Sequence, residues 1–241
     1  MYGICPDSRP DDLNGTSKRN RVGQFINDNK IRFPGSRAGR LREEAARIRR
    51  ARVASVPVTS PANPVPILSG PPGTGKTTVA RLLAECHGRS VHLEADCFFR
   101  FVRSGHVEPW TPESHAQNRT VMGIVGDAAA GYAADGYFTI VDGIVIPRWF
   151  LDPLCERLRE AQLDVAYAIL RAPLSVCTAR LRARESVELA EPAVIEQLWR
   201  SFADLGDLER HVLSLDAEAP AEVADLLARR LDEGSLTLTT T

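Results

Sequence analysis

Lysine is scarce in this chain of 241 residues and occurs only at Lys18, Lys30 and Lys76. Arginine supplies most of the 30 basic side chains, which face 31 acidic ones and leave a net charge of −1. We attribute the scarcity to genomic codon bias rather than to function. Its consequence is that Lys76 is the only lysine after Lys30, which directs attention to the motif around it.

Long apolar runs and paired cysteines are missing too. No run approaches the roughly 18 apolar residues of a membrane-spanning helix, and the N-terminal residues show no apolar signal-peptide core. The five cysteines are odd in number and form no CxxC pair, as expected of reduced thiols in the cytoplasm. Histidine spacings typical of catalytic zinc and the GxSxG hydrolase motif are also absent. We therefore expect a cytoplasmic protein that makes no membrane contact.

Charge is distributed unevenly along the chain. Residues 1–52 carry 13 basic and 6 acidic side chains, whereas the remainder carries 17 basic and 25 acidic ones. Because residues 1–60 show little apolar periodicity and end near a proline-rich stretch, we predict a disordered basic extension and linker there. An Arg-rich arm that binds nucleic acid is a less favoured alternative, and a misassigned translation start is a third. We expect the folded domain at 61–233 and a disordered tail at 234–241.

Apolar runs of strand length alternate with amphipathic stretches from Pro64 onward, which predicts an α/β fold with three layers and a mainly parallel, five-stranded sheet. The expected strands cover residues 65–69, 90–94, 137–145, 164–170 and 211–215. The expected helices cover residues 77–86, 112–134, 150–161, 174–181, 191–205 and a final stretch from 220. Apolar spacing predicts the buried faces of two of these helices: Val121, Ile124, Val125, Ala128 and Tyr132 in one, and Val223, Leu226, Leu227 and Leu231 in the other.

Residues 70–77 read GPPGTGKT and match the phosphate-loop (P-loop) pattern G-x-x-x-x-G-K-[ST] in full. The motif lies between an expected strand and an expected helix, where glycines let backbone N–H groups surround phosphate oxygens and the helix dipole adds positive charge. The alternative is a glycine-rich turn without a nucleotide. We predict that the following residues bind ATP: Gly70, Pro71, Pro72, Gly73, Thr74, Gly75, Lys76, Thr77 and Thr78.

Within this motif, Lys76 is expected to contact the β- and γ-phosphates and the Thr77 hydroxyl to coordinate Mg²⁺. Asp142, at the end of the apolar strand YFTIVDG, is the second expected Mg²⁺ ligand. The next residue is Gly143, where ATPases that hydrolyse for work usually carry a glutamate, so such an ATPase is disfavoured. The guanine-reading NKxD pattern is absent as well, which argues against a GTPase.

Asp96 follows the second expected strand, at the carboxyl end where ligands bind in open α/β sheets. A carboxylate there can accept the proton of an attacking hydroxyl and orient that hydroxyl toward the γ-phosphate. The alternative is that Asp96 caps the following helix. Glu94 is a weaker candidate for the same role.

Polar groups suited to an acceptor are concentrated between the second strand and the long helix. We take Arg100, Asn118 and Arg119 as candidate contacts to the acceptor or phosphate, together with Asp96. Trp110 could stack on a substrate ring or pack in the core.

Four segments together resemble the chloramphenicol phosphotransferase-like and zeta toxin-like branch of small P-loop kinases: GPPGTGKTTVARLLAE, HLEADCFF, EPWTPESHAQNRTV and GYFTIVDGI. The similarity covers about residues 64–232 and implies a P-loop NTPase fold like that of nucleoside kinases. It further implies that Asp96 is the base and that a lid follows the fourth strand. By this resemblance Arg180 and Arg184 reach the phosphates as catalytic groups, whereas the alternative is an exposed cationic helix end. The PWTPESH segment differs from chloramphenicol phosphotransferase, so the antibiotic is not implied as substrate.

These observations predict an ATP- and Mg²⁺-dependent kinase that phosphorylates a hydroxyl of a small molecule, with Asp96, Lys76, Arg180 and Arg184 as catalytic residues. A toxin that phosphorylates a sugar nucleotide falls within this class. One alternative is a polynucleotide or RNA-end kinase that grips its strand through the basic arm. The other is a nucleotide-binding regulatory protein without transfer chemistry.

Overall fold

The computed structural model describes residues 64–183, 191–216 and 218–239. The basic extension expected at 1–60, the candidate lid residue Arg184 and the last two residues lie outside this described part. Within it, no helix is long and apolar enough to cross a membrane.

The centre of the described domain is a parallel sheet of five strands in the order β2-β3-β1-β4-β5. The predicted α/β class, with a parallel five-stranded sheet, is therefore confirmed. The strands are β1 (Val65–Ser69), β2 (Ser90–Glu94), β3 (Phe138–Asp142), β4 (Val165–Arg171) and β5 (Val212–Ser214). β3 is shorter than expected and ends at Asp142, although the N–H of the next residue, Gly143, still donates to the carbonyl of Leu68 in β1 at 3.2 Å.

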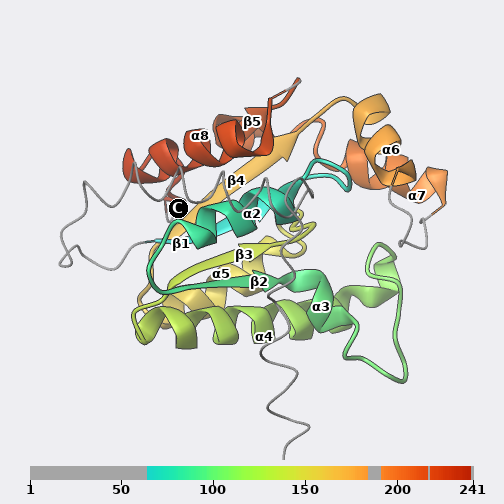
Figure 1. Cartoon of the computed structure of the whole chain (residues 1–241). Helices are drawn as coiled ribbons and strands as arrows, with labels where there is room; N and C mark the ends of the chain where they lie inside the picture. Colours follow the sequence, from blue (N-terminus) through green and yellow to red (C-terminus); the bar gives the residue numbers. More distant parts are fainter. Residues whose placement is uncertain (1–63, 184–190, 217, 240–241) are drawn as a thin grey trace, which may run out of the picture. The chain divides into compact units, whose positions relative to one another are not determined.

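Helices cover both faces of the sheet (Figure 1). One face packs on α2 (Lys76–Glu85) and α8 (Pro220–Asp232), and the other on α4 (His115–Ala134) and α5 (Leu151–Glu160). The remaining helices are α3 (Ala95–Phe99), α6 (Leu174–Arg182) and α7 (Pro192–Arg200), with 3-10 turns at Pro112–Ser114 and Gly206–His211. The helix expected at 191–205 thus stops at Arg200. Side chains of the central strand β1 alternate between the two cores, because Ile67 faces one and Leu68 the other.

The buried face of α4 differs from the prediction. Ile124 and Tyr132 are 51% and 43% exposed, whereas Met122 and Gly126 are buried. A side chain at Gly126 would lie 2.7 Å from Cβ of Arg157 on α5, so the helices approach each other along a face without large side chains. The prediction was therefore right for Val121 and Val125, which are buried, and wrong for Ile124 and Tyr132. On α8, similarly, Leu226 is 37% exposed rather than buried.

The expected disordered tail is ordered over its described residues. Leu236 is completely buried, and its carbonyl accepts a hydrogen bond of 2.9 Å from the backbone N–H of Tyr167 in β4. The N–H of Leu238 donates to the carbonyl of Val165 at 2.9 Å, and Ala166 and Thr237 form an antiparallel bridge. The segment thus pairs with the first half of β4, on the side where β5 pairs with the second half.

Candidate active site

The phosphate loop connects β1 to α2 and is packed tightly against its neighbours. Gly70 and Gly73 have φ values of 135° and 86°, which side chains rarely adopt. A Cβ at Gly70 would collide with the carbonyl oxygen of Leu170, and one at Gly73 would lie 2.5 Å from the carbonyl oxygen of Cys177 on α6. Both glycines are therefore required by space as well as by conformation.

The loop leads into α2, whose N-terminus is not capped by a side chain. Gly75, in the left-handed conformation, occupies the N-cap position and makes no side-chain hydrogen bond to the helix. The first N–H groups of a helix have no intrahelical partner, so this end is suited to an anion. Lys76 is 8% exposed and its Nζ donates to the carbonyl oxygen of Pro71 at 3.0 Å, across the loop. The Thr74 hydroxyl donates to the same oxygen at 2.9 Å and stiffens the loop.

Thr77 and Asp142, the two expected metal ligands, are in contact. The Thr77 hydroxyl donates to Oδ2 of Asp142 at 2.7 Å, although the two residues lie 65 positions apart in sequence. Oxygen donors from a hydroxyl and a carboxylate are those that Mg²⁺ prefers, so the pair fits this ion. Asp142 itself is only 3% exposed.

The second oxygen of Asp142 contacts a residue that the sequence reasoning missed. Nε2 of His92, on the neighbouring strand β2, lies 2.7 Å from Oδ1 of Asp142. The period of two along a strand places His92 on the same face as Glu94, and that polar pair was the available signal. His92 therefore helps to fix the orientation of the Asp142 carboxylate.

Asp96 lies in the first turn of α3, directly after β2. Its side chain reaches solvent, yet protein atoms crowd it, and this burial raises the pKa of the Asp96 carboxyl above its ordinary value while the charge of Lys76 opposes the shift. A Cβ at Gly143 would lie 2.9 Å from Cβ of Ala95 and 3.8 Å from Oδ1 of Asp96. α3 therefore occupies the space that a glutamate after Asp142 would need.

A cavity of about 260 Å³ opens beside Asp96. It is enclosed by α3, the loop before α4, α4 itself, the segment after β3, and α7. Among the described residues its walls are formed by Ala95, Asp96, Phe99, His106, Glu108, Pro109, Trp110, Met122, Ile144, Val145, Phe150 and Leu198. Since this cavity contains the candidate base, it is the candidate acceptor pocket.

The first turn of α4 holds the loop that borders this cavity. The Gln117 side chain both accepts from the N–H of Val107 at 2.9 Å and donates to its carbonyl at 2.7 Å. Asn118 is completely buried, and its Nδ2 donates to the carbonyl of Pro109 at 2.8 Å and to the Ser114 hydroxyl at 2.7 Å. Asn118, predicted to touch the acceptor, thus holds Pro109 in the pocket wall and is not itself a lining residue. Gln117 was not singled out by the sequence.

The three described arginines that were predicted to contact phosphate or acceptor lie in different places. Arg180 on α6 donates from Nη1 to the carbonyl of Thr74 at 3.4 Å, so it lies at the phosphate loop. Arg119 instead pairs with Glu156 on α5 at 2.9 Å, which takes its side chain away from the cavity. Arg100 donates to Sγ of Cys97 at 2.9 Å. It is also close enough to Asp96 for its positive charge to oppose the rise in the pKa of that carboxyl.

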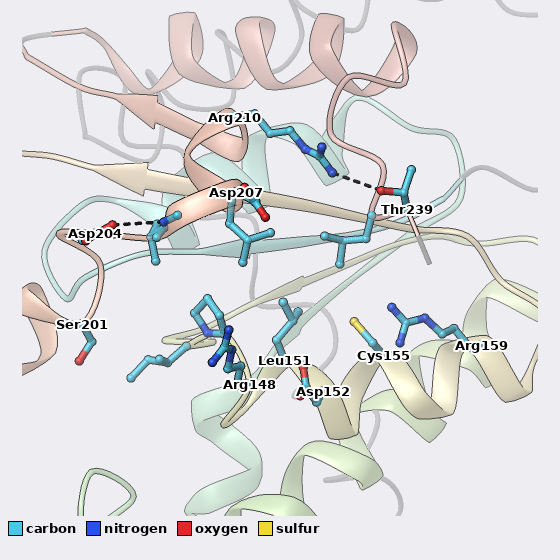
Figure 2. A pocket seen from close by; sticks show the side chains of 16 residues that line it. Arg148, Leu151, Asp152, Cys155, Arg159, Ser201, Asp204, Asp207, Arg210 and Thr239 are labelled. Atoms are coloured by element: carbon cyan, nitrogen blue, oxygen red, sulfur yellow. Dashed lines mark hydrogen bonds between the residues drawn. The ribbon is translucent and has the colours of Figure 1, made fainter. Parts of the chain in front are cut away.

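A larger cavity of about 940 Å³ lies elsewhere, between the start of α5 and the segment that leads to β5. Figure 2 shows Arg148 and Arg159 beside it on the α5 side and Arg210 on the opposite side. Three aspartates among its lining residues balance these three arginines. It includes neither Asp96 nor any residue of the phosphate loop, so we do not assign the transfer reaction to it.

Comparison with a family profile gives a match over residues 65–205, to AAA_33, described as an AAA domain. This segment spans β1 to the residues just after α7 and contains the phosphate loop, Asp96, Asp142 and Arg180. No curated protein sequence matches the chain significantly.

Several solved structures share the fold. The tunicamycin resistance protein of Deinococcus radiodurans superposes with a TM-score of 0.54 and 22% identity, covering 69% of this chain and 95% of that protein. A gluconokinase from Sinorhizobium meliloti gives 0.53 and 18%, covering 73% and 95%. The APS kinase of Mycobacterium tuberculosis, solved with AMPPNP and APS, gives 0.50 and 18%, covering 71% and 99%. The fold is therefore that of small P-loop kinases, as the resemblance implied.

Proposed function

Because the chain belongs to the AAA domain family AAA_33 through residues 65–205, we propose that it is an ATP-dependent phosphotransferase that phosphorylates a hydroxyl of a small molecule. The support comes from one spatial relationship. The phosphate loop, the Thr77–Asp142 pair and Asp96 lie at the carboxyl edge of the same parallel strands, and a cavity adjoins Asp96. Open α/β sheets bind their ligands at this edge.

The phosphate loop binds the triphosphate of ATP. The N-terminus of α2 directs its N–H groups and its dipole at the phosphates, and Lys76 exchanges the Pro71 carbonyl for a phosphate oxygen. Thr77 and Asp142 would hold a Mg²⁺ ion, which would supply positive charge to the phosphates. Arg180, next to Thr74, stabilises the charge that spreads over the transferred group.

Asp96 activates the acceptor. Its carboxylate accepts the proton as the hydroxyl oxygen forms a bond to the γ-phosphorus and the bond from that phosphorus to the β–γ bridging oxygen breaks, releasing ADP. The raised pKa of Asp96 makes its carboxylate a stronger base than an ordinary aspartate. Because α3 fills the space beside Gly143, a water-activating glutamate has no room there, which favours transfer over hydrolysis.

The test is acceptor-stimulated ADP release by the full chain, screened over hydroxyl-bearing metabolites, nucleosides, aminoglycosides and RNA ends. Asp96→Asn is expected to reduce the stimulated rate by about 10²–10⁴-fold. Lys76→Ala should weaken ATP binding. The matched controls are Asp152→Asn, an exposed carboxylate in the first turn of α5, and Arg81→Ala, an exposed cation on α2.

Two results would contradict the proposal. If Asp96→Asn turned over as fast as the unmodified protein, Asp96 would not be the base. Tight ATP binding without stimulated turnover by any acceptor would favour a nucleotide-binding regulatory protein instead.

A further inference from the structure

The cavity beside Asp96 is apolar over most of its wall. Twelve described residues line it, and four of them have polar side-chain atoms: Asp96, His106, Glu108 and Trp110. Phe99 and Phe150 form an edge-to-face pair with ring centroids 6.2 Å apart, and Met122 and Val145 are each 1% exposed. Because these buried side chains are fixed by packing, the wall cannot readily present other groups to a ligand.

Backbone groups of two wall residues, Val145 and Pro109, already have partners within the protein. The carbonyl of Val145 accepts hydrogen bonds from the Ser69 hydroxyl at 2.9 Å and from the Tyr167 hydroxyl at 2.6 Å, and its N–H donates to Ser69 Oγ at 3.0 Å. The carbonyl of Pro109 accepts from Asn118 Nδ2 at 2.8 Å and from the Ser114 hydroxyl at 3.0 Å. A carbonyl has two lone pairs, so the Val145 carbonyl is saturated from within the protein. The Pro109 carbonyl is bonded to Asn118 and shares the single Ser114 proton with the Thr111 carbonyl, which lies 2.7 Å from that hydroxyl.

Charge in the cavity has one sign. Asp96 and Glu108 are acidic, and among the described lining residues there is no lysine or arginine. A carboxylate or phosphate on the acceptor would therefore meet like charge from Asp96 and Glu108, whereas the two cations that act on Asp96, Lys76 and Arg100, lie outside the lining. Burial already raises the pKa of Asp96, and a second anion beside it would raise that pKa further.

We propose that the acceptor is a compact, neutral or cationic alcohol with an aromatic or alicyclic body, rather than a polyol or a hydroxy acid. This inference rests on the proposed function. The apolar body lies among Phe99, Trp110 and Phe150, and the reacting hydroxyl meets Asp96. Any further polar group of the acceptor lies near His106 and Glu108, both of which are solvent-exposed. The volume of about 260 Å³ is just below the range of roughly 300–1,000 Å³ that holds drug-sized ligands, so the body is small.

Polyols are disfavoured because each hydroxyl that loses water needs a new partner. Apart from Asp96, this wall offers few groups with free hydrogen-bonding capacity, and an unpaired hydroxyl weakens binding by roughly tenfold. The gluconokinase that shares the fold is named for a polyhydroxy acid. We therefore expect the two proteins to differ in the acceptor pocket although they share the sheet and the phosphate loop.

The experiment compares three probes of similar size: 1-naphthylmethanol, sorbitol and gluconate. Binding to the full chain is followed by ligand-detected NMR without nucleotide, and ADP release is followed with ATP and Mg²⁺. We expect 1-naphthylmethanol to bind at least about tenfold more tightly than the other two. Trp110→Ala should weaken that binding by a similar factor, whereas Phe101→Ala, an aromatic side chain that is 71% exposed and outside the cavity, should not. Ile144→Ser, at a half-buried wall position, gives a second test if Trp110→Ala destabilises the fold.

The outcomes separate this inference from the proposed function. Equal or tighter binding of sorbitol or gluconate, or preferential turnover of either, would overturn the apolar class while leaving the kinase intact. Binding of 1-naphthylmethanol that depends on Trp110, without ADP release for any probe, would support the apolar pocket and count against the kinase. Failure of 1-naphthylmethanol to bind at all would also overturn the inference.

Discussion

The Thr77 hydroxyl donates a 2.7 Å hydrogen bond to Oδ2 of Asp142, and this bond joins the first turn of α2 to the end of β3. With His92 on the other oxygen, the carboxylate is held from two sides. The two expected metal ligands are thus in position without a nucleotide. Such preorganisation reduces the rearrangement that metal binding requires.

Thr77→Val keeps the side-chain shape and removes the hydroxyl. We expect ATP affinity in the presence of Mg²⁺ to fall by about 10–100-fold, because a hydrogen bond to a charged group and a metal ligand are lost together. Affinity without Mg²⁺ should change less. Titration calorimetry with and without the metal measures both. Thr120→Val, on the exposed surface of α4, is the matched control, and an equal loss in the two conditions would contradict the metal role.

Gly143→Ala tests the close contact between β3 and α3. The added Cβ would lie 2.9 Å from Cβ of Ala95, so α3 must shift and Asp96 moves with it. We expect a loss of about 1–3 kcal/mol in the free energy of unfolding and reduced turnover with little change in ATP affinity. Gly131→Ala, in a helical position with open space, should instead stabilise by about 0.5–1 kcal/mol. Unchanged turnover in Gly143→Ala would show that the placement of Asp96 is not critical.

Asp96 should give opposite pH effects on stability and on activity. Because burial raises its pKa in the folded state, the folded protein holds this proton more tightly than the unfolded chain does. The stability contribution is therefore present at low pH and lost as pH rises from the unfolded pKa through the raised folded pKa, whereas kcat/KM rises over the pH range of the folded pKa. Asp96→Asn should melt at a higher temperature at neutral pH while losing turnover. Thermal melts and rate profiles across pH check both, and a lower melting temperature would contradict this account.

Gln117→Ala removes both hydrogen bonds that hold Val107. The loss is about 1 kcal/mol for each bond, and it loosens the loop that borders the acceptor cavity. We expect KM for the acceptor to rise while KM for ATP stays the same, so the nucleotide provides an internal control. Steady-state kinetics with each substrate varied in turn separates the two, and a parallel rise in both would point to a general loss of folding.

Sequence patterns predicted the strand β1, the phosphate loop and the candidate metal ligands Thr77 and Asp142, because these depend on local spacing and a continuous motif. The direct contact between Thr77 and Asp142 was seen only in the structure. Helix faces were less predictable. On α4 the neighbouring residues Asn118 and Arg119 were treated alike, but successive side chains point in different directions around a helix. Asn118 is buried and holds Pro109, whereas Arg119 reaches Glu156 on α5.

Contacts between distant segments left little trace in the sequence. His92 contacts Asp142 only because β2 and β3 are neighbours in register, with Glu94 opposite Asp142. The sequence showed that glycine stands at position 143, where many ATPases carry a glutamate. It did not show that Ala95 approaches this position closely enough to exclude a side chain, because that approach depends on the packing of α3. The ordered segment around Leu236 escaped detection because its few apolar residues are separated by polar ones, and its order comes from pairing with β4.

The pairing of residues 236–238 with β4 also affects how the chain can fold during synthesis. Translation delivers β1 to β4 long before these residues leave the ribosome, and until then the first half of β4 presents unpaired backbone groups on one side. Exposed strand edges of this kind are templates for association between nascent chains. The nascent domain therefore passes through a stage in which its central sheet is assembled but still open to a strand from another molecule, and chaperone occupancy at that stage would favour a high yield.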